Sequence, residues 1–95
     1  MRIGAADGDE GLRDVRVTYD PDADAAYLNL VDRDLQPGEA VHQSDLGDTP
    51  GGRGTLIADF ARDGRLLGIE VLGARAVLPP ELLHGAPPPA EGGGR

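Results

Sequence analysis

Apolar and polar residues alternate along two stretches of the chain, and in each stretch a turn signal separates two alternating runs. This pattern predicts two β-hairpins, because strand side chains point alternately to opposite faces of a sheet. In the second stretch, Asp63 and Gly64 favour a two-residue type I′ turn. One face of that hairpin then carries three apolar pairs: Phe60 with Leu67, Ala58 with Ile69, and Leu56 with Val71. The other face is mixed: Ala61 with Leu66, Asp59 with Gly68, Ile57 with Glu70, and Thr55 with Leu72.

The first stretch has a four-residue loop over 21–24, where Pro21 presets a turn. Folding back at this loop again gathers six residues on one face: Tyr19 with Ala26, Val17 with Leu28, and Val15 with Leu30. The other face takes Thr18 with Tyr27, Arg16 with Asn29, and Asp14 with Val31. An alternative is that the alanine-rich residues 23–26 extend a helical turn.

The remaining segments predict a small framework around these hairpins. Residues 39–43 predict a short strand, with Ala40 and His42 on one face, and residues 44–54 a long mobile loop rich in glycine. Residues 78–85 predict a short helix, with Pro80 near its first position and Gly85 just past its end. Residues 1–13 and 86–95 are expected to be disordered tails, which leaves one domain over 14–85. The fold class is therefore mainly β (α+β), an antiparallel sheet of two hairpins with a C-terminal helix.

Composition and charge exclude several functions. The 95 residues allow one domain, and the formal charge of −8 speaks against binding a phosphate backbone. The nine basic residues are scattered, and an acidic surface attracts basic partners. The chain has no cysteine, which fits a reducing cytoplasm, and no apolar run long enough to cross a membrane.

Apolar residues on both faces of the sheet favour self-association. A single thin sheet cannot cover both faces, so we expect a homodimer. The residues expected to form the contact surface all lie on the mixed face: Tyr27, Val31, Ile57, Leu66 and Leu72. We expect Leu78, Leu82 and Leu83 of the helix to cover part of it, so a second core layer is the alternative.

Two motifs give the chain a family resemblance. Residues 19–30 read Tyr-Asp-Pro-Asp-Ala-Asp-Ala-Ala-Tyr-Leu-Asn-Leu, and residues 63–72 read Asp-Gly-Arg-Leu-Leu-Gly-Ile-Glu-Val-Leu. Together they resemble a family of small prokaryotic proteins, the domain of unknown function numbered twenty-two eighty-three. The chain departs from the family pattern in its longer, glycine-rich loop over 44–54 and in Ala61 and Arg62 after Asp59 and Phe60. The resemblance implies a small antiparallel β domain and no known activity. Members of this family are often encoded beside small toxin-like proteins, which suggests an antitoxin-like role for some of them.

Candidate chemical sites are weak. Asp20, Asp22 and Asp24 alternate like the start of a calcium loop, but Ala25 and Val31 stand where such a loop needs Gly and Glu. His42, His84 and Asp45 lack metal-ligand spacing, Ser44 with His42 and Asp45 lacks triad geometry, and residues 51–54 lack the features of a phosphate loop. We therefore expect no catalytic, cofactor-binding or metal-binding residues and no cofactor.

The sequence favours a non-enzymatic protein-interaction module, self-associating and acting on a small basic protein, with neither nucleic acid nor a membrane as partner. The alternative is a small enzyme or ligand-binding or metal-binding protein whose site lies at a dimer interface. That site would be built from residues of both hairpins and the strand between them: Asp20, Asp24, His42 and Glu70. A third possibility is a structural accessory protein whose partner is a second copy of itself.

Overall fold

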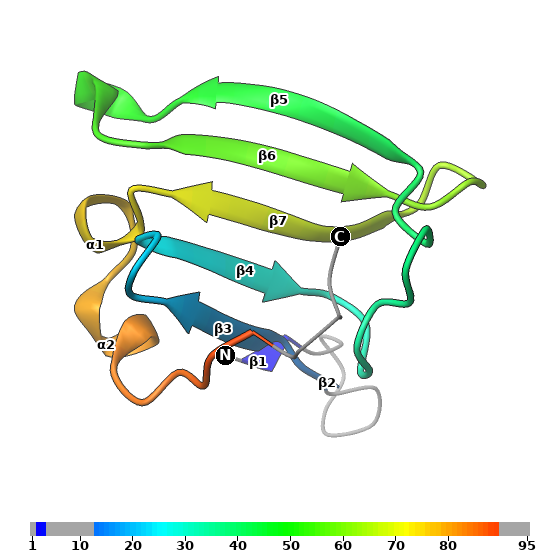
Figure 1. Cartoon of the computed structure of the whole chain (residues 1–95), viewed down its shortest axis with the longest axis horizontal. Coiled ribbons are helices and arrows are strands. Elements are labelled where there is room, and N and C mark those ends of the chain that lie inside the picture. Colours follow the sequence, from blue (N-terminus) through cyan, green and yellow to red (C-terminus); the bar gives the residue numbers. More distant parts are fainter. Residues whose placement is uncertain (1, 4–12, 90–95) are drawn as a thin grey trace.

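The fold is a five-stranded antiparallel sheet with two short helices near the C-terminal end of the chain (Figure 1). The computed structural model describes residues 2–3 and 13–89. The sheet has the order β3-β4-β7-β6-β5. Its strands are β3 (Arg16–Asp20), β4 (Ala25–Asn29), β5 (His42–Asp48), β6 (Thr55–Phe60) and β7 (Leu66–Leu72). The helices are η1 (Pro50–Gly52), α1 (Ala74–Val77) and α2 (Pro80–Leu83), and none of the described helices is long enough to span a membrane.

The first hairpin confirms the predicted loop position and register over five pairs, from Arg16 with Asn29 to Asp20 with Ala25, whereas the predicted pairs of Val15 with Leu30 and Asp14 with Val31 are not formed. Val17 lies opposite Leu28, and Tyr19 lies opposite Ala26. Residues 21–24 form the turn, and no helix extends into 23–26. The period-two sorting of side chains was therefore sufficient to fix this pairing.

The second hairpin confirms most of the predicted register but not its turn. Leu56 lies opposite Val71 and Ala58 opposite Ile69, whereas Phe60 lies opposite Leu66 rather than Leu67. Gly64 has a φ of +89°, but Asp63 does not have the positive φ that a type I′ turn requires. Hydrogen bonds from Gly64 N to Ala61 O and from Ala61 N to Arg65 O close a three-residue loop over 62–64 instead.

The bulge between Asp59 and Phe60 absorbs the additional loop residue. The predicted two-residue turn and the pairings of Phe60 with Leu67 and of Ala61 with Leu66 were therefore wrong, and Leu66 shares the face of Phe60 instead. The five pairs that run from Thr55 with Leu72 to Asp59 with Gly68 keep the predicted register.

The segment between the hairpins differs more from the prediction. β5 covers residues 42–48 and pairs with β6, so half of the loop expected over 44–54 is strand, and the strand expected over 39–43 begins only at His42. An edge strand with exposed side chains needs no apolar alternation, which explains why the pattern was missed. η1 occupies the middle of the remaining loop.

β4 and β7 pair at the centre of the sheet and join the two hairpins. Ala26 lies opposite Val71, and Tyr27 lies opposite Glu70, so the apolar faces of the two hairpins form one continuous face. We call this surface the helix face, because Ala74 of α1 completes its core with Ala26 and Val71. The other surface, which carries Tyr27 and Glu70, is called the mixed face.

The two C-terminal helices lie on the helix face, not on the mixed face. Leu78 and Leu83 pack against the core of Ala26, Val71 and Ala74, as do Tyr19 and Leu56 from the sheet. The expectation that Leu78, Leu82 and Leu83 cover the mixed face was therefore wrong. α2 has the predicted proline at its start, whereas α1 was not predicted.

The ends of the predicted domain differ in part from the expectation. Arg2–Ile3 (β1) and Arg13–Asp14 (β2) form an antiparallel pair, so the expectation of a disordered tail over 1–13 was wrong for residues 2, 3 and 13. Residues 86–89 contain no helix or strand, and the Pro87 carbonyl accepts a hydrogen bond from the Tyr19 amide. The expectations for residues 1, 4–12 and 90–95 lie outside the described residues.

Candidate functional site

A buried polar network lies at the centre of the mixed face. Asp59 is completely buried, and its carboxylate accepts hydrogen bonds from the Tyr27 hydroxyl at 2.9 Å and from the Gln43 side-chain amide at 2.9 Å. Tyr27 comes from β4, Gln43 from β5 and Asp59 from β6. Since β7 lies between β4 and β6, the Tyr27 side chain reaches Asp59 across β7. The hydrogen bonds satisfy a carboxylate that would otherwise be costly to bury.

Gly68 makes this network possible. It lies opposite Asp59 on β6 and opposite Asn29 on β4, and the ring of Tyr27 crosses directly over it. A Cβ at this position would fall 2.5 Å from Cζ of Tyr27. Glycine is therefore required because a side chain would occupy the space of the ring.

The structure places three of the five predicted contact residues together on the mixed face. Tyr27 and Ile57 flank the largely buried Glu70, with Leu72 two residues further along β7. Leu66 lies opposite Phe60 and therefore on the helix face, so its expected place on the mixed face was wrong, and Val31 follows the end of β4. Leu66 and Leu72 are 38% and 36% exposed, and the other three are partly buried.

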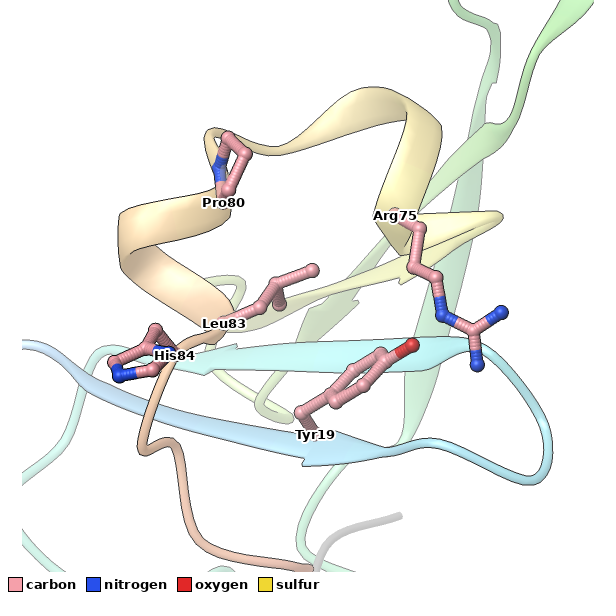
Figure 2. A pocket seen from close by; sticks show the side chains of 5 residues that line it. All are labelled: Tyr19, Arg75, Pro80, Leu83 and His84. Atoms are coloured by element: carbon pink, nitrogen blue, oxygen red, sulfur yellow. The ribbon is translucent and has the colours of Figure 1, made fainter.

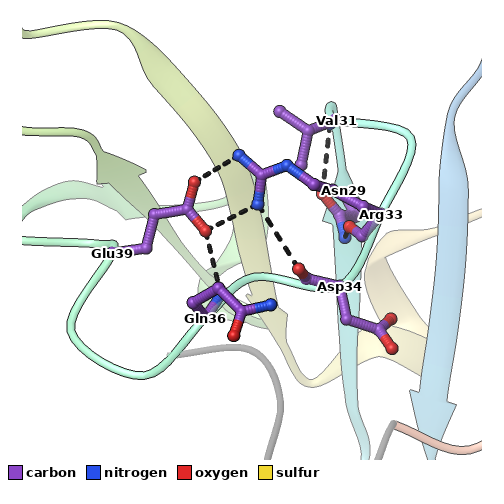
Figure 3. Close-up of polar contacts among 6 residues, drawn as sticks. All are labelled: Asn29, Val31, Arg33, Asp34, Gln36 and Glu39. Carbon is purple, nitrogen blue, oxygen red and sulfur yellow. Dashed lines mark hydrogen bonds and ion pairs between the residues drawn. The ribbon is translucent and has the colours of Figure 1, made fainter.

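The loop that follows β4 is anchored beside the buried polar network. The side-chain amide of Asn29 donates to Arg33 O at 2.9 Å, and Arg16 donates to Asp34 at 2.8 Å. Arg33 forms a bidentate ion pair with Glu39, and the backbone amide of Gln36 donates to the same carboxylate at 2.9 Å (Figure 3). The loop is therefore an ordered part of the fold, and its Leu35 is buried.

The ion pair in this loop makes stability depend on pH. Hydrogen bonds from Arg33 and Gln36 lower the pKa of Glu39 from 4.5 to about 2. A depressed pKa in the folded state gives stability that is present above pH 4.5 and is lost as the pH falls towards 2. We expect Glu39→Gln to lower the urea midpoint at pH 6 and the difference from the parent to shrink as the pH falls towards 2. Glu81→Gln, at an exposed position of α2, is the control, and a constant difference for Glu39→Gln across this range would contradict the prediction.

A second polar cluster connects the first hairpin to α1. Asp24 has a φ of +50°, and its backbone carbonyl accepts hydrogen bonds from the amides of Gly73 and Ala74, both at 3.0 Å. Its carboxylate accepts from the Tyr19 hydroxyl at 2.8 Å and from the Arg75 amide at 3.0 Å. These hydrogen bonds lower the pKa of Asp24, whereas burial and the same bond to Asp24 raise the pKa of Tyr19.

A shallow pocket of about 410 Å³ lies beside this cluster, between α2 and β3 (Figure 2). Its lining consists of Tyr19, Arg75, Pro80, Leu83 and His84. Arg75 also donates to the Pro21 carbonyl at 3.2 Å and faces Asp24, so both ends of its guanidinium group have structural contacts. No pattern in the sequence indicated this pocket, because α1 was not predicted.

The residues of the alternative site are not brought together within one copy. Asp20 and Asp24 lie at the turn between β3 and β4, Glu70 lies within β7, and His42 starts the edge strand β5. Asp20 instead accepts a hydrogen bond from the Asp22 amide at 3.0 Å, as in an Asx turn. The described part of the chain holds no group of three or more His, Cys, Asp or Glu side chains arranged for a metal ion.

The family model described as a protein of unknown function, DUF2283, matches residues 16–75. The chain belongs to the DUF2283 family. The match covers all five strands of the main sheet and both motifs noted in the sequence. No curated protein and no solved structure matches the chain. The structure therefore adds to the DUF2283 description a physical role for Tyr27 and Gly68, which come from different motifs and meet at the buried Asp59.

Proposed function

We propose that this DUF2283 protein is a non-enzymatic protein-interaction module that self-associates through its mixed face. The observation that carries the proposal is the position of the helices. Both α1 and α2 pack against the opposite face, and Leu72 remains exposed on the mixed face, which it shares with the partly buried Tyr27 and Ile57. Exposed apolar side chains that share a sheet face are typical of a contact surface.

The small size of the core supports self-association. The buried apolar side chains among the described residues are Val15, Ala26, Leu35, Ala58, Leu67, Val71 and Ala74. Three of these seven are alanine, so each contributes little to the hydrophobic stabilisation. A second copy packed against the mixed face would supply the second layer that a sheet requires.

The polar groups of the sheet favour a structural role over catalysis. The carboxylate of Asp59 is held by Tyr27 and Gln43, and that of Asp24 is held by Tyr19 and the Arg75 amide. Both carboxylates therefore connect elements of the fold. We propose an antitoxin-like role in the cytoplasm, in which the acidic module neutralises a small basic protein, and the charge of −8 supports this choice of partner.

Self-association is tested by placing a charge on the mixed face. We expect the parent chain to be a dimer at about 100 µM by size-exclusion chromatography with light scattering, and Leu72→Asp to be a monomer, because a carboxylate buried in an apolar contact is unfavourable. The matched control is Leu46→Asp, which introduces the same charge at a residue that is 55% exposed on the sheet edge. A monomeric parent chain, or a dimer that Leu72→Asp leaves unchanged, would contradict the proposal.

A further inference from the structure

The two edges of the main sheet differ in how they are covered. At the β3 edge, the Tyr19 amide donates to the Pro87 carbonyl at 2.9 Å, and α2 packs beside the strand. At the other edge, β5 is the last strand, and within residues 13–89 no further strand pairs with its outer side (Figure 1). An uncovered edge strand presents backbone donors and acceptors to a partner strand.

β5 is long and open for an edge strand. It spans seven residues, and all except Gly47 are exposed. Its inner side is held by six residue pairs with β6, so the strand is already extended before any partner arrives. A preformed strand lowers the entropic cost of adding another strand.

A bulge in β5 gives this edge a charge pattern. Asp45 lies opposite Ile57 and Asp48 lies opposite Thr55, with the register shift at Leu46 between them. Ile57 and Thr55 are two residues apart on β6, so the bulge brings both aspartates to the mixed face. Hydrogen bonds from the Gly47 amide to Asp45 at 2.8 Å and from the Thr55 hydroxyl to Asp48 at 2.9 Å fix the two carboxylates.

These charges select the occupant of the edge. Antiparallel pairing of two β5 strands, centred on Asp45 or on the bulge, sets aspartate against aspartate of the second copy, which is unfavourable. A strand with basic side chains at alternate positions instead places two cations on the same face as Asp45 and Asp48. The edge therefore disfavours a second copy of the chain and favours a basic segment.

We propose that the outer edge of β5 binds an extended basic segment of another protein as an added strand, with arginine or lysine side chains at alternate positions facing Asp45 and Asp48. This inference rests on the proposed interaction function and specifies its partner surface. The exposed side chain of Leu46 lies between the two aspartates in sequence and offers an apolar contact next to them. Self-association uses the mixed face, and partner binding uses this edge.

The test uses the full chain and a short synthetic peptide in which arginine alternates with valine. We expect the peptide to bind and to shift the backbone amide NMR signals of residues 42–48. Asp45→Asn combined with Asp48→Asn is expected to weaken binding at least about tenfold, since two close charge pairs are lost. The control replaces Asp22 and Asp32, two exposed aspartates outside β5, by asparagine and changes the net charge equally.

Strand addition is separated from general charge attraction by two N-methylated forms of the peptide, each methylated at one of the two alternating sets of amides. An added strand pairs through one set, so one form should lose binding and the other should keep it. Equal binding of both forms, or equal weakening by the two pairs of asparagine substitutions, would overturn the proposal. A monomeric parent chain that still binds the peptide at β5 would contradict self-association and leave this inference intact.

Discussion

Replacing Gly68 with alanine should lower the free energy of unfolding by about 2–4 kcal/mol. The new Cβ would lie 2.5 Å from Cζ and 2.6 Å from Cε2 of Tyr27, and closer still to the hydroxyl. The ring must move, and its hydrogen bond to the buried Asp59 is then lost. Urea denaturation followed by circular dichroism measures the change.

A double-mutant cycle with Tyr27→Ala identifies the cause of this loss. Without the ring, the alanine at Gly68 meets no clash, so its cost should fall by more than about 1 kcal/mol in the Tyr27→Ala background. Gly38→Ala is the control for backbone strain without a clash. A Cβ at Gly38 has open space, whereas the φ of +79° is unfavourable for alanine. Additive effects of the two substitutions would show that the ring over Gly68 is not the reason.

Replacing Asp24 with alanine is expected to lower the free energy of unfolding by about 2–3 kcal/mol. The alanine must adopt the φ of +50° that Asp24 has in the turn, and the Tyr19 hydroxyl and the Arg75 amide lose their shared acceptor. The connection between the first hairpin and α1 is weakened at the same time. Thermal and urea unfolding measure the loss.

Two further substitutions at Asp24 separate backbone strain from hydrogen bonding. Asparagine tolerates a positive φ and retains an acceptor oxygen, so Asp24→Asn should cost less than about 1 kcal/mol. Glycine adopts the positive φ without strain but, like alanine, has no acceptor oxygen. The free energy of unfolding of Asp24→Gly should therefore lie between those of Asp24→Asn and Asp24→Ala. Equal stability of the alanine and asparagine variants would contradict this account.

The sequence predicted what depends on local pairing. Tyr19 opposite Ala26 and Leu56 opposite Val71 follow from period-two sorting around a turn, and both pairs are present. The turn at Asp63 and Gly64 was displaced because the same pair also suits a three-residue loop that ends in a positive-φ glycine. Local chemistry therefore determined the strands more firmly than the type of turn between them.

Features that depend on how distant segments meet were not predictable. The contact between Tyr27 and Asp59 requires β4 to lie beside β7, and no local pattern indicates that order. The side of the sheet on which the helices pack depends on α1, a single turn whose preceding Gly73 has a φ of +73°. The edge strand β5 was missed because its exposed polar residues resemble a loop.

The central pairing of β4 with β7 has a consequence for the order in which the chain folds. β3 with β4, and β5 with β6 and β7, are neighbours along the chain and can form independently, whereas Ala26 and Val71 meet only when the intervening segment closes. Closing such a segment is slow compared with forming a hairpin, but its entropic cost rises only weakly with length. Changes in the length of the loop between β4 and β5 should thus alter the folding rate modestly, while substitutions at the seam between Ala26 and Val71 govern whether the two halves join.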